Sequence, residues 1–464
     1  MITGDTIAAI ATAPGRGGVA VVRVSGPEAF SIGRKVTSAD GRVVGWSADR
    51  MTNRISAQHA LFYDLSSEHR SIRPSEHVID DGIILAFKAP HSYTGEDVVE
   101  FQCHGGTVTP RRVLEACLAA GARLARRGEF TERAFLNGRL DYSQAESVLD
   151  LIDAKTTRAA DAALEGLSGR RQCEIRALYE SALDLSTRLE HALDVDEGEL
   201  PPDFLPSVHS SLLTLHSSLR AALSKAAEGR LLKSGALVVL AGQPNAGKSS
   251  LLNALLDENR AIVSDVPGTT RDSIEAWIDL DGWPIRLVDT AGLREAKDEV
   301  EGEGVRRSED LIAKADVVVL FQVSGFKFHV PGFDSINLKH ETCNLKLIPI
   351  HAKCDLGRGE GLNVSAKTGA GIEDLKRAIV AKLEEKVAAS DSGDTPEGDV
   401  MAYHEALALL APLFPLPSSL FPSSDLVLLA NAVRSASERL GEAIGATYSS
   451  DLLDNLFSRF CVGK

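Results

Sequence analysis

The clearest candidate for chemistry is a short glycine-rich stretch near the middle of the chain, AGQPNAGKSS. Within it, Gly242 to Ser249 fits the pattern G-x-x-x-x-G-K-[ST], after the apolar run ALVVLAG and before the helical run SLLNALL. Glycines here let backbone N–H groups curl around phosphate oxygens, and the N-terminus of the following helix favours negative charge. Lys248 would reach the β- and γ-phosphates, and the Ser249 hydroxyl would bind Mg²⁺. The pattern therefore predicts a nucleotide-binding P-loop.

Four stretches downstream of the P-loop narrow the prediction to a GTPase. PGTTRD lies where a switch loop should carry a threonine to the metal, and IRLVDTAGL ends a strand at Asp289, a carboxylate that would hold Mg²⁺ through water. AKCD follows the apolar run LKLIPI, and VSAKTG comes shortly afterwards. Four such motifs in this order are very specific. The predicted GTP contacts are Gly242, Asn245, Ala246, Gly247, Lys248, Ser249, Ser250, Asp289, Thr290, Ala291, Gly292, Lys353, Asp355, Ser365 and Ala366.

The base-reading motif resembles that of the translation-factor-like GTPases, with one departure. In that family the motif is Asn-Lys-x-Asp, and its aspartate accepts hydrogen bonds from guanine. Asp355 keeps this role and Lys353 would pack its stem along the base, but Ala352 stands where the asparagine should be. One amide contact is therefore missing. We expect this to lower affinity for guanine more than selectivity for it, because a wrong base still leaves Asp355 unpaired.

A second departure concerns the attacking water. Leu293 stands where Ras-like enzymes have a glutamine that orients this water. Another group must take over that role. The acidic stretch REAKDEVEGEG could supply a carboxylate, or it could be a solvated loop. Asn245, inside the P-loop, offers a neutral oxygen that could face a monovalent cation beside the phosphates.

The composition is that of a globular protein with several domains. The chain has 464 residues, 44% of them hydrophobic and 25% charged, which is too long for one ordinary core. We expect no membrane span, because no run of about 18 apolar residues appears. The N-terminus lacks signal-peptide features and the six cysteines form no CxxC pair, so we expect a cytoplasmic protein with free thiols. The net charge of −15 means that any RNA contact needs a local basic patch.

Three compositional regimes indicate how the motifs are positioned. Residues 1–125 contain short β-type runs such as GVAVVRVSG and DVVEFQCHGG, with one helical stretch, which predicts an α+β domain. Residues 126–230 and 386–464 carry apolar residues at helical spacings. Residues 231–385 alternate β and α patterns around the P-loop. This order predicts an all-α domain into which an α/β GTPase domain is inserted, at a loop that tolerates insertion.

Stretches outside the GTPase domain resemble the tRNA-modification GTPase family called MnmE or TrmE. They are DTIAAIATAPGRGGVAVVRVSG, SYTGEDVVEFQCHGG, RRGEFTERAFLNGRLDYSQAESVLDLI and the terminal FCVGK. The resemblance implies a homodimer, built by a folate-binding-like N-terminal domain, that acts with the flavoprotein MnmG (GidA) in a heterotetramer-type complex. Together they would install a carboxymethylaminomethyl-type group at C5 of the wobble uridine of certain tRNAs. The one-carbon donor would be 5,10-methylene- or 5-formyl-tetrahydrofolate, and GTP hydrolysis would use Mg²⁺ and K⁺.

The resemblance also implies roles for individual residues. Glu301, in the acidic stretch, matches the glutamate that orients water. Cys461 becomes a candidate nucleophile toward the uridine, or a residue that supports the site, and Gly463 would permit a close turn beside it. The implied ligands are Ser249 and Thr270 for Mg²⁺; Asn245, Ser264, Val266 and Thr269 for K⁺; and Arg23, Glu100, Arg139 and Lys464 for folate.

Several of these residues also have an ordinary structural explanation. Arg23 could be a solvated edge residue, Glu100 could pair with any neighbouring base, and Arg139 could cap a helix. Cys103 and His104 are assigned to structure, because adjacent residues on a strand rarely face each other. For the whole chain, the alternatives are a GTP-gated assembly or regulatory switch without a direct role in tRNA chemistry and, ranked last, an aminomethyltransferase acting alone.

Overall fold

The chain divides into two compact units, Met1–Leu149 with Thr447–Lys464, and Asp150–Ala446. In the part of the chain that the structure describes, no helix is long and apolar enough to cross a membrane. The computed structural model describes residues 4–37, 55–65, 78–194, 200–242, 245–258, 275–289, 310–322, 347–357, 359, 361–388, 399–411, 423–445, 457, 460, 461 and 463.

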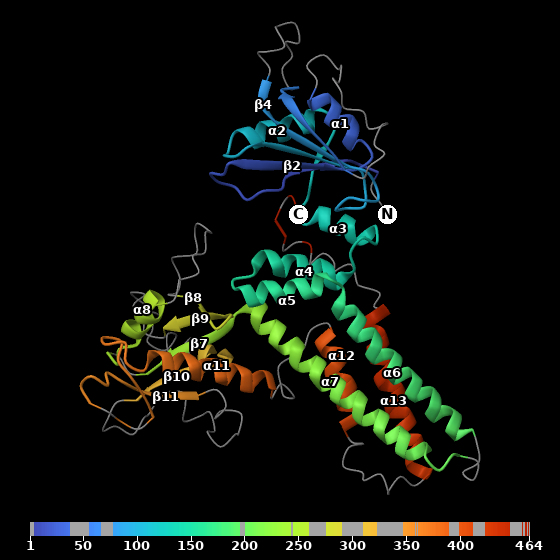
Figure 1. Cartoon of the computed structure of the whole chain (residues 1–464), viewed down its shortest axis with the longest axis vertical. Coiled ribbons are helices and arrows are strands. Elements are labelled where there is room, and N and C mark those ends of the chain that lie inside the picture. The colour runs from blue at the N-terminus through green and yellow to red at the C-terminus, as the bar shows by residue number, and fades with distance from the viewer. Residues whose placement is uncertain are drawn as a thin grey trace. The chain divides into compact units, whose positions relative to one another are not determined.

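The first unit is built on a six-stranded sheet with strand order β3-β4-β5-β2-β1-β6 (Figure 1). Neighbouring strands are antiparallel except for β6, which runs parallel to β1. Helices α1 and α2 cover one face and share its hydrophobic core. The elements are β1 (Ile7–Ile10), β2 (Val19–Ser25), α1 (Ala29–Val36), β3 (Ile55–Tyr63), β4 (Val78–Phe87), β5 (Val98–His104), α2 (Thr109–Ala119), β6 (Arg123–Leu124) and α3 (Glu129–Leu136). Helix α4 (Tyr142–Asp153) begins in the first unit and ends in the second.

Successive side chains of β2 point to opposite faces of this sheet. Ala20, Val22 and Val24 are buried under the helices, because every second residue of a strand points to the same side. Arg23 therefore points to the opposite face. On that face Ile7 and Ala9 of β1 pack in a smaller cluster with Phe130 of α3. The strands of this α+β domain thus place a charged residue beside an apolar cluster.

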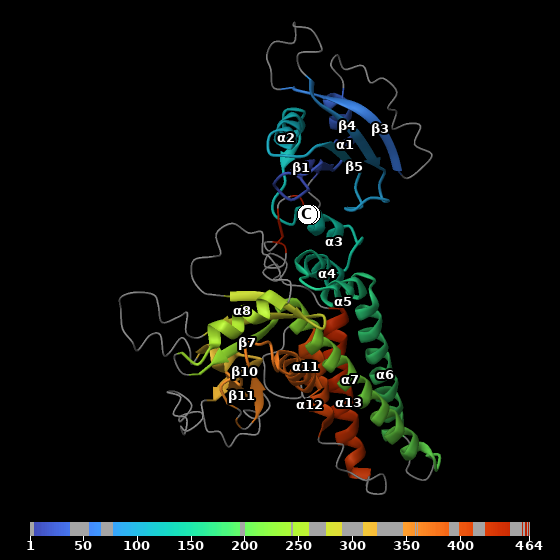
Figure 2. The ribbon, with the colours of Figure 1, turned by 60° about the vertical axis from the view of Figure 1, so that its left-hand side comes forward.

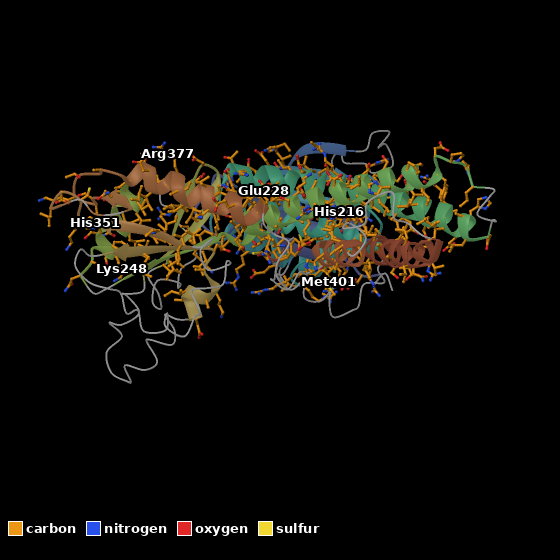
Figure 3. The ribbon with its side chains drawn as sticks, turned by 90° about the horizontal axis from the view of Figure 1, so that it is seen from below. His216, Glu228, Lys248, His351, Arg377 and Met401 are labelled. Atoms are coloured by element: carbon orange, nitrogen blue, oxygen red, sulfur yellow. The ribbon has the colours of Figure 1, made fainter. Side chains whose placement is uncertain are left out.

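The helices of the second unit form a bundle from two separated stretches of chain. They are α5 (Thr157–Leu167), α6 (Arg170–Leu193), α7 (Phe204–Ser234), α12 (Asp399–Leu410) and α13 (Ser423–Gly445). Leucines recur on one side of α7 at three- and four-residue spacings, and they share one core with α6, α12 and α13 (Figures 1 and 2). A few large hydrophobic side chains of these helices lie outside the core, such as Met401 of α12, which is 47% exposed (Figure 3). The predicted all-α domain with an insertion is therefore confirmed.

The inserted domain is an α/β domain with strand order β12-β11-β10-β7-β9-β8. All neighbouring strands are parallel except β8, which is antiparallel to β9. Its elements are β7 (Ala236–Ala241), α8 (Lys248–Glu258), β8 (Glu275–Leu280), β9 (Trp283–Asp289), β10 (Val317–Gln322), β11 (Leu347–Ala352), β12 (Leu362–Val364) and α11 (Ile372–Ala388). The predicted strands ALVVLAG, IRLVD and LKLIPI correspond to β7, β9 and β11.

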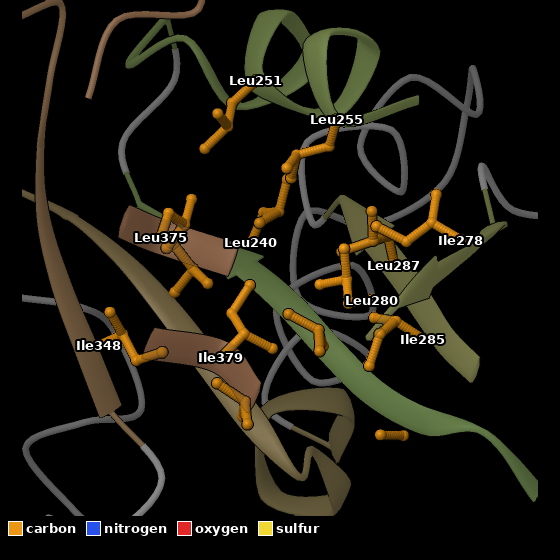
Figure 4. Packing of buried hydrophobic residues seen from close by; sticks show 14 of the residues in the cluster. Leu240, Leu251, Leu255, Ile278, Leu280, Ile285, Leu287, Ile348, Leu375 and Ile379 are labelled. Atoms are coloured by element: carbon orange, nitrogen blue, oxygen red, sulfur yellow. The ribbon is translucent and has the colours of Figure 1, made fainter. Parts of the chain in front are cut away.

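Strand β7 lies at the centre of this sheet and is buried along its whole length. Leu240 packs on one face against α8 and α11, as Figure 4 shows with Leu251, Leu255 and Ile379. Leu237, Val239 and Ala241 belong to a second core on the other face. A central parallel strand covered on both faces has apolar side chains at every position, which is why β7, ALVVLA, contains no polar residue.

Candidate functional site

The P-loop follows β7 and leads into α8, as the motif predicts. Gly242 has a φ of +154°, and a Cβ there would lie 2.7 Å from Cβ of Phe321, so only glycine fits. Asn245 adopts a φ of 62° and Gly247 a φ of 100°. Nζ of Lys248, the first residue of α8, donates a hydrogen bond to the Gly242 carbonyl at 2.9 Å. These features hold the predicted phosphate-binding lysine folded over its own loop.

The two predicted magnesium-site residues of the described chain are in direct contact. Ser249 Oγ donates a hydrogen bond to Oδ2 of Asp289 at 2.7 Å. Asp289 is the last residue of β9 and is 2% exposed, and it pairs in register with Leu240 of β7. A hydroxyl in the first turn of α8 and a carboxylate at the end of β9 are hard oxygen donors of the kind that Mg²⁺ prefers, so this pair fits that ion.

The predicted base-reading residues lie beside the P-loop. Lys353, just after β11, has a φ of 58°, and its Nζ donates to the Asn245 carbonyl at 3.1 Å. Ser365 Oγ donates to Oδ1 of Asp355 at 2.7 Å. This hydrogen bond is the main cause that lowers the pKa of Asp355, and Lys367 and Lys353 contribute. The carboxylate is therefore held ionised, ready to accept from a base N–H.

Other predicted residues of the nucleotide site are only partly placed. Ala246 is buried in the core of the inserted domain, and Ala366 packs against that core. Ser250 lies in the first turn of α8 and is exposed. The predicted residues that fall outside the described part of the chain are Ser264, Val266, Thr269, Thr270, Thr290, Ala291, Gly292, Leu293, Glu301 and Lys464.

In the first unit, two predicted folate contacts pair with each other. Arg23 of β2 and Glu100 of β5 are directly opposite in the antiparallel ladder, and Arg23 Nε donates to Glu100 Oε1 at 2.8 Å. The Arg23 guanidinium also lies 5.1 Å from the ring centroid of Tyr93 and 5.6 Å from that of Phe130. The two charged side chains keep only 20% and 15% of their surface exposed. Arg23 is therefore not a solvated edge residue. The other structural explanation, that Glu100 pairs with a neighbouring basic side chain, agrees with its ion pair with Arg23.

The third predicted folate contact reaches the same loop from another direction. Arg139, three residues beyond the end of α3, donates from Nε to the Ser92 carbonyl at 3.4 Å and is otherwise exposed. The next residue, Tyr93, shares a hydrogen bond with Thr131 at 2.8 Å, and burial is the main cause that raises its pKa. The loop at residues 92 and 93 thus touches both Arg23 and Arg139.

A buried ion network in the same domain was not anticipated from the sequence. Arg133 of α3 is 5% exposed and bonds to Asp5, Glu96 and Glu129. Burial acts to raise the pKa of Glu129, but hydrogen bonds from Arg123 and from the Arg126 backbone outweigh it, so the pKa is lowered. Glu129 precedes Arg133 by four residues, but Asp5 and Glu96 are 128 and 37 residues away, so no local pattern points to the whole network.

The C-terminal residues return to the N-terminal domain. Phe457 and Phe460 pack in a cluster with Ala145 and Leu149 of α4. The carbonyl of Cys461 accepts from the Gly128 N–H at 3.5 Å, and the Cys461 side chain is exposed. The described part of the tail is therefore docked, with its thiol accessible.

The tail passes close to backbone at two glycines. A Cβ on Gly463, whose φ is +101°, would lie 2.1 Å from the Ile10 carbonyl oxygen at the end of β1. A Cβ on Gly128 would lie 2.4 Å from the Phe457 carbonyl oxygen. Ile10 is next to Ala9, which pairs in register with Arg23. At Gly463 the tail therefore meets the end of the strand beside the one that carries Arg23, a predicted folate contact.

Cys103 and His104 point to opposite sides of β5, as expected for adjacent strand residues. Cys103 is buried, with its pKa raised to about 11 mainly by burial. His104 is exposed, and its pKa is raised mainly by its hydrogen bond to Asp80. Asp80, Asp81 and His104 gather possible metal ligands within 4.8 Å of one another. Both carboxylate oxygens of Asp80 already bind the ring and backbone nitrogens of His104, the last residue of β5. These hydrogen bonds at the end of β5 explain why the three residues lie together.

Similarity to known proteins extends along the entire chain. A family model for the N-terminus of the GTP-binding protein TrmE matches residues 6–139, and one for the MnmE helical domain matches residues 142–461. The chain is 41% identical to a "tRNA modification GTPase MnmE" from Dichelobacter nodosus and 40% identical to one from Nitrosomonas europaea, and each alignment covers 100% of both proteins. The G domain of the T. maritima FeoB iron transporter is 27% identical over 32% of this chain and 98% of its own, with a TM-score of 0.23, too low to support a conclusion. The family models and the full-length relatives establish that the chain belongs to the MnmE (TrmE) family of tRNA modification GTPases.

Proposed function

We propose that the protein is a GTPase that acts with the flavoprotein MnmG to install a carboxymethylaminomethyl-type group at C5 of the wobble uridine of certain tRNAs. The observation that carries the GTPase part is the contact of Ser249 with Asp289, next to a lysine-bearing P-loop. The similarity to relatives named tRNA modification GTPases, over their full length, supports the tRNA part.

The residues of the inserted domain divide the work of binding and hydrolysing GTP. Lys248 would leave the Gly242 carbonyl for the phosphates, and Ser249 and Asp289 would hold Mg²⁺ together with Thr270. Asp355 would read the base. Because Leu293 cannot orient water, Glu301 is proposed for that role. The proposed K⁺ ligands, which would add positive charge beside the phosphates, are Asn245, Ser264, Val266 and Thr269.

The N-terminal domain would hold the folate that donates the one-carbon unit. Arg23 and Glu100 form a half-buried ion pair flanked by aromatic rings, and such a pair suits a flat, polar ring system. Arg139 is exposed and could pair with the folate glutamate tail, and Lys464 would meet the cofactor from the C-terminus. Cys461 would act on the uridine or support the site. We further propose a homodimer that works in the cytoplasm in a heterotetramer-type complex with MnmG.

The direct test is mass spectrometry of wobble-uridine nucleosides in a strain that lacks the gene. We expect the modified nucleoside to disappear and to return with a plasmid copy, but not with a Ser249→Ala copy. Unchanged modification in the deletion strain would overturn the tRNA part. In that case the alternative, a GTP-gated assembly or regulatory switch, would remain.

The potassium proposal has its own test in the purified protein. GTP turnover should be roughly tenfold or more faster in KCl than in NaCl, because a positive charge placed at the phosphates stabilises the transition state. Asn245→Gly removes the proposed ligand without straining the backbone, whose φ is 62°. This variant should lose the difference between the salts. Equal turnover of the wild type in both salts would remove the role of Asn245.

A further inference from the structure

One turn of the inserted domain is bound to the helical domain by several independent contacts. Strands β8 and β9 are joined by Asp281 and Gly282, with φ values of 50° and 84°, as a two-residue hairpin turn requires. The hydroxyl of Thr156, the N-cap of α5, accepts from the Ala159 N–H and donates to the Gly282 carbonyl at 2.7 Å. The residue that begins α5 therefore also holds the tip of the hairpin.

Arg158, in the first turn of α5, joins three elements at the same place. Its guanidinium carbon lies 4.2 Å from the ring centroid of Trp283, the first residue of β9. Its Nε donates to Oε1 of Glu228 on α7 at 3.2 Å. The charge of Arg158 is thus paired with an acid of the helical domain while its flat face covers a tryptophan of the inserted domain.

Two glycines let the backbones approach this closely. A Cβ on Gly282 would lie 2.9 Å from Cβ of Arg158. A Cβ on Gly235, which follows α7, would lie 2.3 Å from the ring of Trp277 in β8. Both strands of the hairpin therefore contact the helical domain, one through Trp277 and the other through Trp283.

The hydrophobic core is continuous across this contact. Ala159 of α5 and Leu231 and Leu232 of α7 belong to the same buried cluster as Trp283 and Ile285 of β9. Trp283 is 1% exposed. Packed cores move between discrete arrangements rather than deforming smoothly. A shift of the hairpin would therefore carry α5 with it instead of being absorbed locally.

The far ends of the hairpin strands lead to the nucleotide. Strand β9 ends at Asp289, which accepts from Ser249, and the PGTTRD stretch comes just before β8 begins at Glu275. We propose that Thr156 and Arg158 are positioning residues that anchor the β8–β9 turn to α5, so that a displacement of Asp289 by the bound nucleotide is transmitted to the helical domain. This inference rests on the proposed GTPase function and adds a route for its output.

Hydrogen–deuterium exchange of the full-length chain tests the route, with α5 peptides compared between GDP and a non-hydrolysable GTP analogue. In the wild type we expect exchange rates in α5 to differ between the two states by about fivefold or more, the lower end of typical coupling between sites. In Arg158→Ala this difference should vanish, while the difference at the P-loop remains. A residue that only stabilises the fold would raise exchange equally in both states.

Three further variants keep the test falsifiable. Arg158→Lys keeps the charge and should retain part of the difference, and Thr156→Ser keeps the donor and the cap and should retain all of it. Arg170→Ala is the matched control, because Arg170 pairs with Glu165 of α5 away from the hairpin and should leave the difference unchanged. The inference is overturned if wild-type α5 exchanges alike in both states, or if Arg158→Ala keeps the difference. Failure of the chain to bind either nucleotide would overturn the proposed function as well, so the two failures are distinguishable.

Discussion

Replacing Gly463 by alanine should separate the C-terminal tail from the rest of the machinery. The methyl group would sit 2.1 Å from the Ile10 carbonyl oxygen and 2.8 Å from its carbon. Ile10 belongs to β1, which is held by β2 on one side and by β6 on the other. The strand cannot move away without breaking these ladders, so the tail must leave its path.

The size of the effect follows from two contributions. An alanine at the observed φ of +101° costs about 1–3 kcal/mol in backbone strain. The clash adds to this until the tail moves by about 1 Å, to a normal van der Waals distance. A total near 2 kcal/mol shifts the balance between docked and free tail by roughly 30-fold. Because only the last residues detach, the free energy of unfolding should fall by no more than about 1 kcal/mol.

The assay compares tRNA modification and GTP hydrolysis in the same preparation, with MnmG present. We expect product formation to fall about fivefold, because docking worth about 1 kcal/mol keeps roughly 85% of the tails docked and a 30-fold shift leaves roughly 15%. GTP turnover should stay within about twofold, since the change is remote from the P-loop. Gly121→Ala is the matched control, because Gly121 has a φ of +119° with nothing within 4 Å of a Cβ. Full modification by Gly463→Ala would refute the reasoning, and so would an equal loss in Gly121→Ala.

Three further results are expected. The hydrogen bond from Ser365 lowers the pKa of Asp355, so the stabilisation by the ionised carboxylate is fully present above the unfolded pKa and is lost as pH falls through the lower folded pKa. In Ser365→Ala, nucleotide binding measured against pH should therefore be lost at a higher pH than in the wild type. An unchanged midpoint would contradict the assignment. Ala352→Asn should tighten GDP binding roughly two- to tenfold, because one added hydrogen bond contributes about 0.5–1.5 kcal/mol. If calorimetry shows no gain in affinity, the absent amide contact does not limit guanine binding. Iodoacetamide at pH 8 should alkylate exposed Cys461 but not Cys103, whose pKa burial raises to about 11, until the protein is unfolded; similar rates by mass spectrometry would argue against this burial.

The nucleotide site was predictable from the sequence because its parts are local. Each motif lies at the end of an apolar run, and the carboxyl ends of parallel strands meet at one edge of a sheet. The motif therefore sufficed to place Lys248, Ser249 and Asp289 together. The β-type residue pattern likewise predicted the two strands β2 and β5. It did not predict that Arg23 of one strand lies opposite Glu100 of the other.

The remainder depends on contacts between residues far apart in the chain. Strand register fixes the Arg23–Glu100 pair, and no periodicity within one segment reveals the register between two. The same holds for Arg133 and Asp5, and for the stacking of Arg158 on Trp283, where two domains meet. The domain boundaries given above remain predictions, as do the roles of the switch residues.

The docking of Phe457 and Phe460 on α4 also constrains how the chain is made. Their partners Ala145 and Leu149 leave the ribosome about 300 residues earlier, which at about 5–20 residues per second is roughly 15–60 s. The sheet of the first unit can form in that interval, but the apolar side of α4 must wait uncovered. We therefore expect nascent chains to present α4 to chaperones until Phe457 and Phe460 have been synthesised. Release of that segment from the ribosome then becomes the event that seals the N-terminal domain.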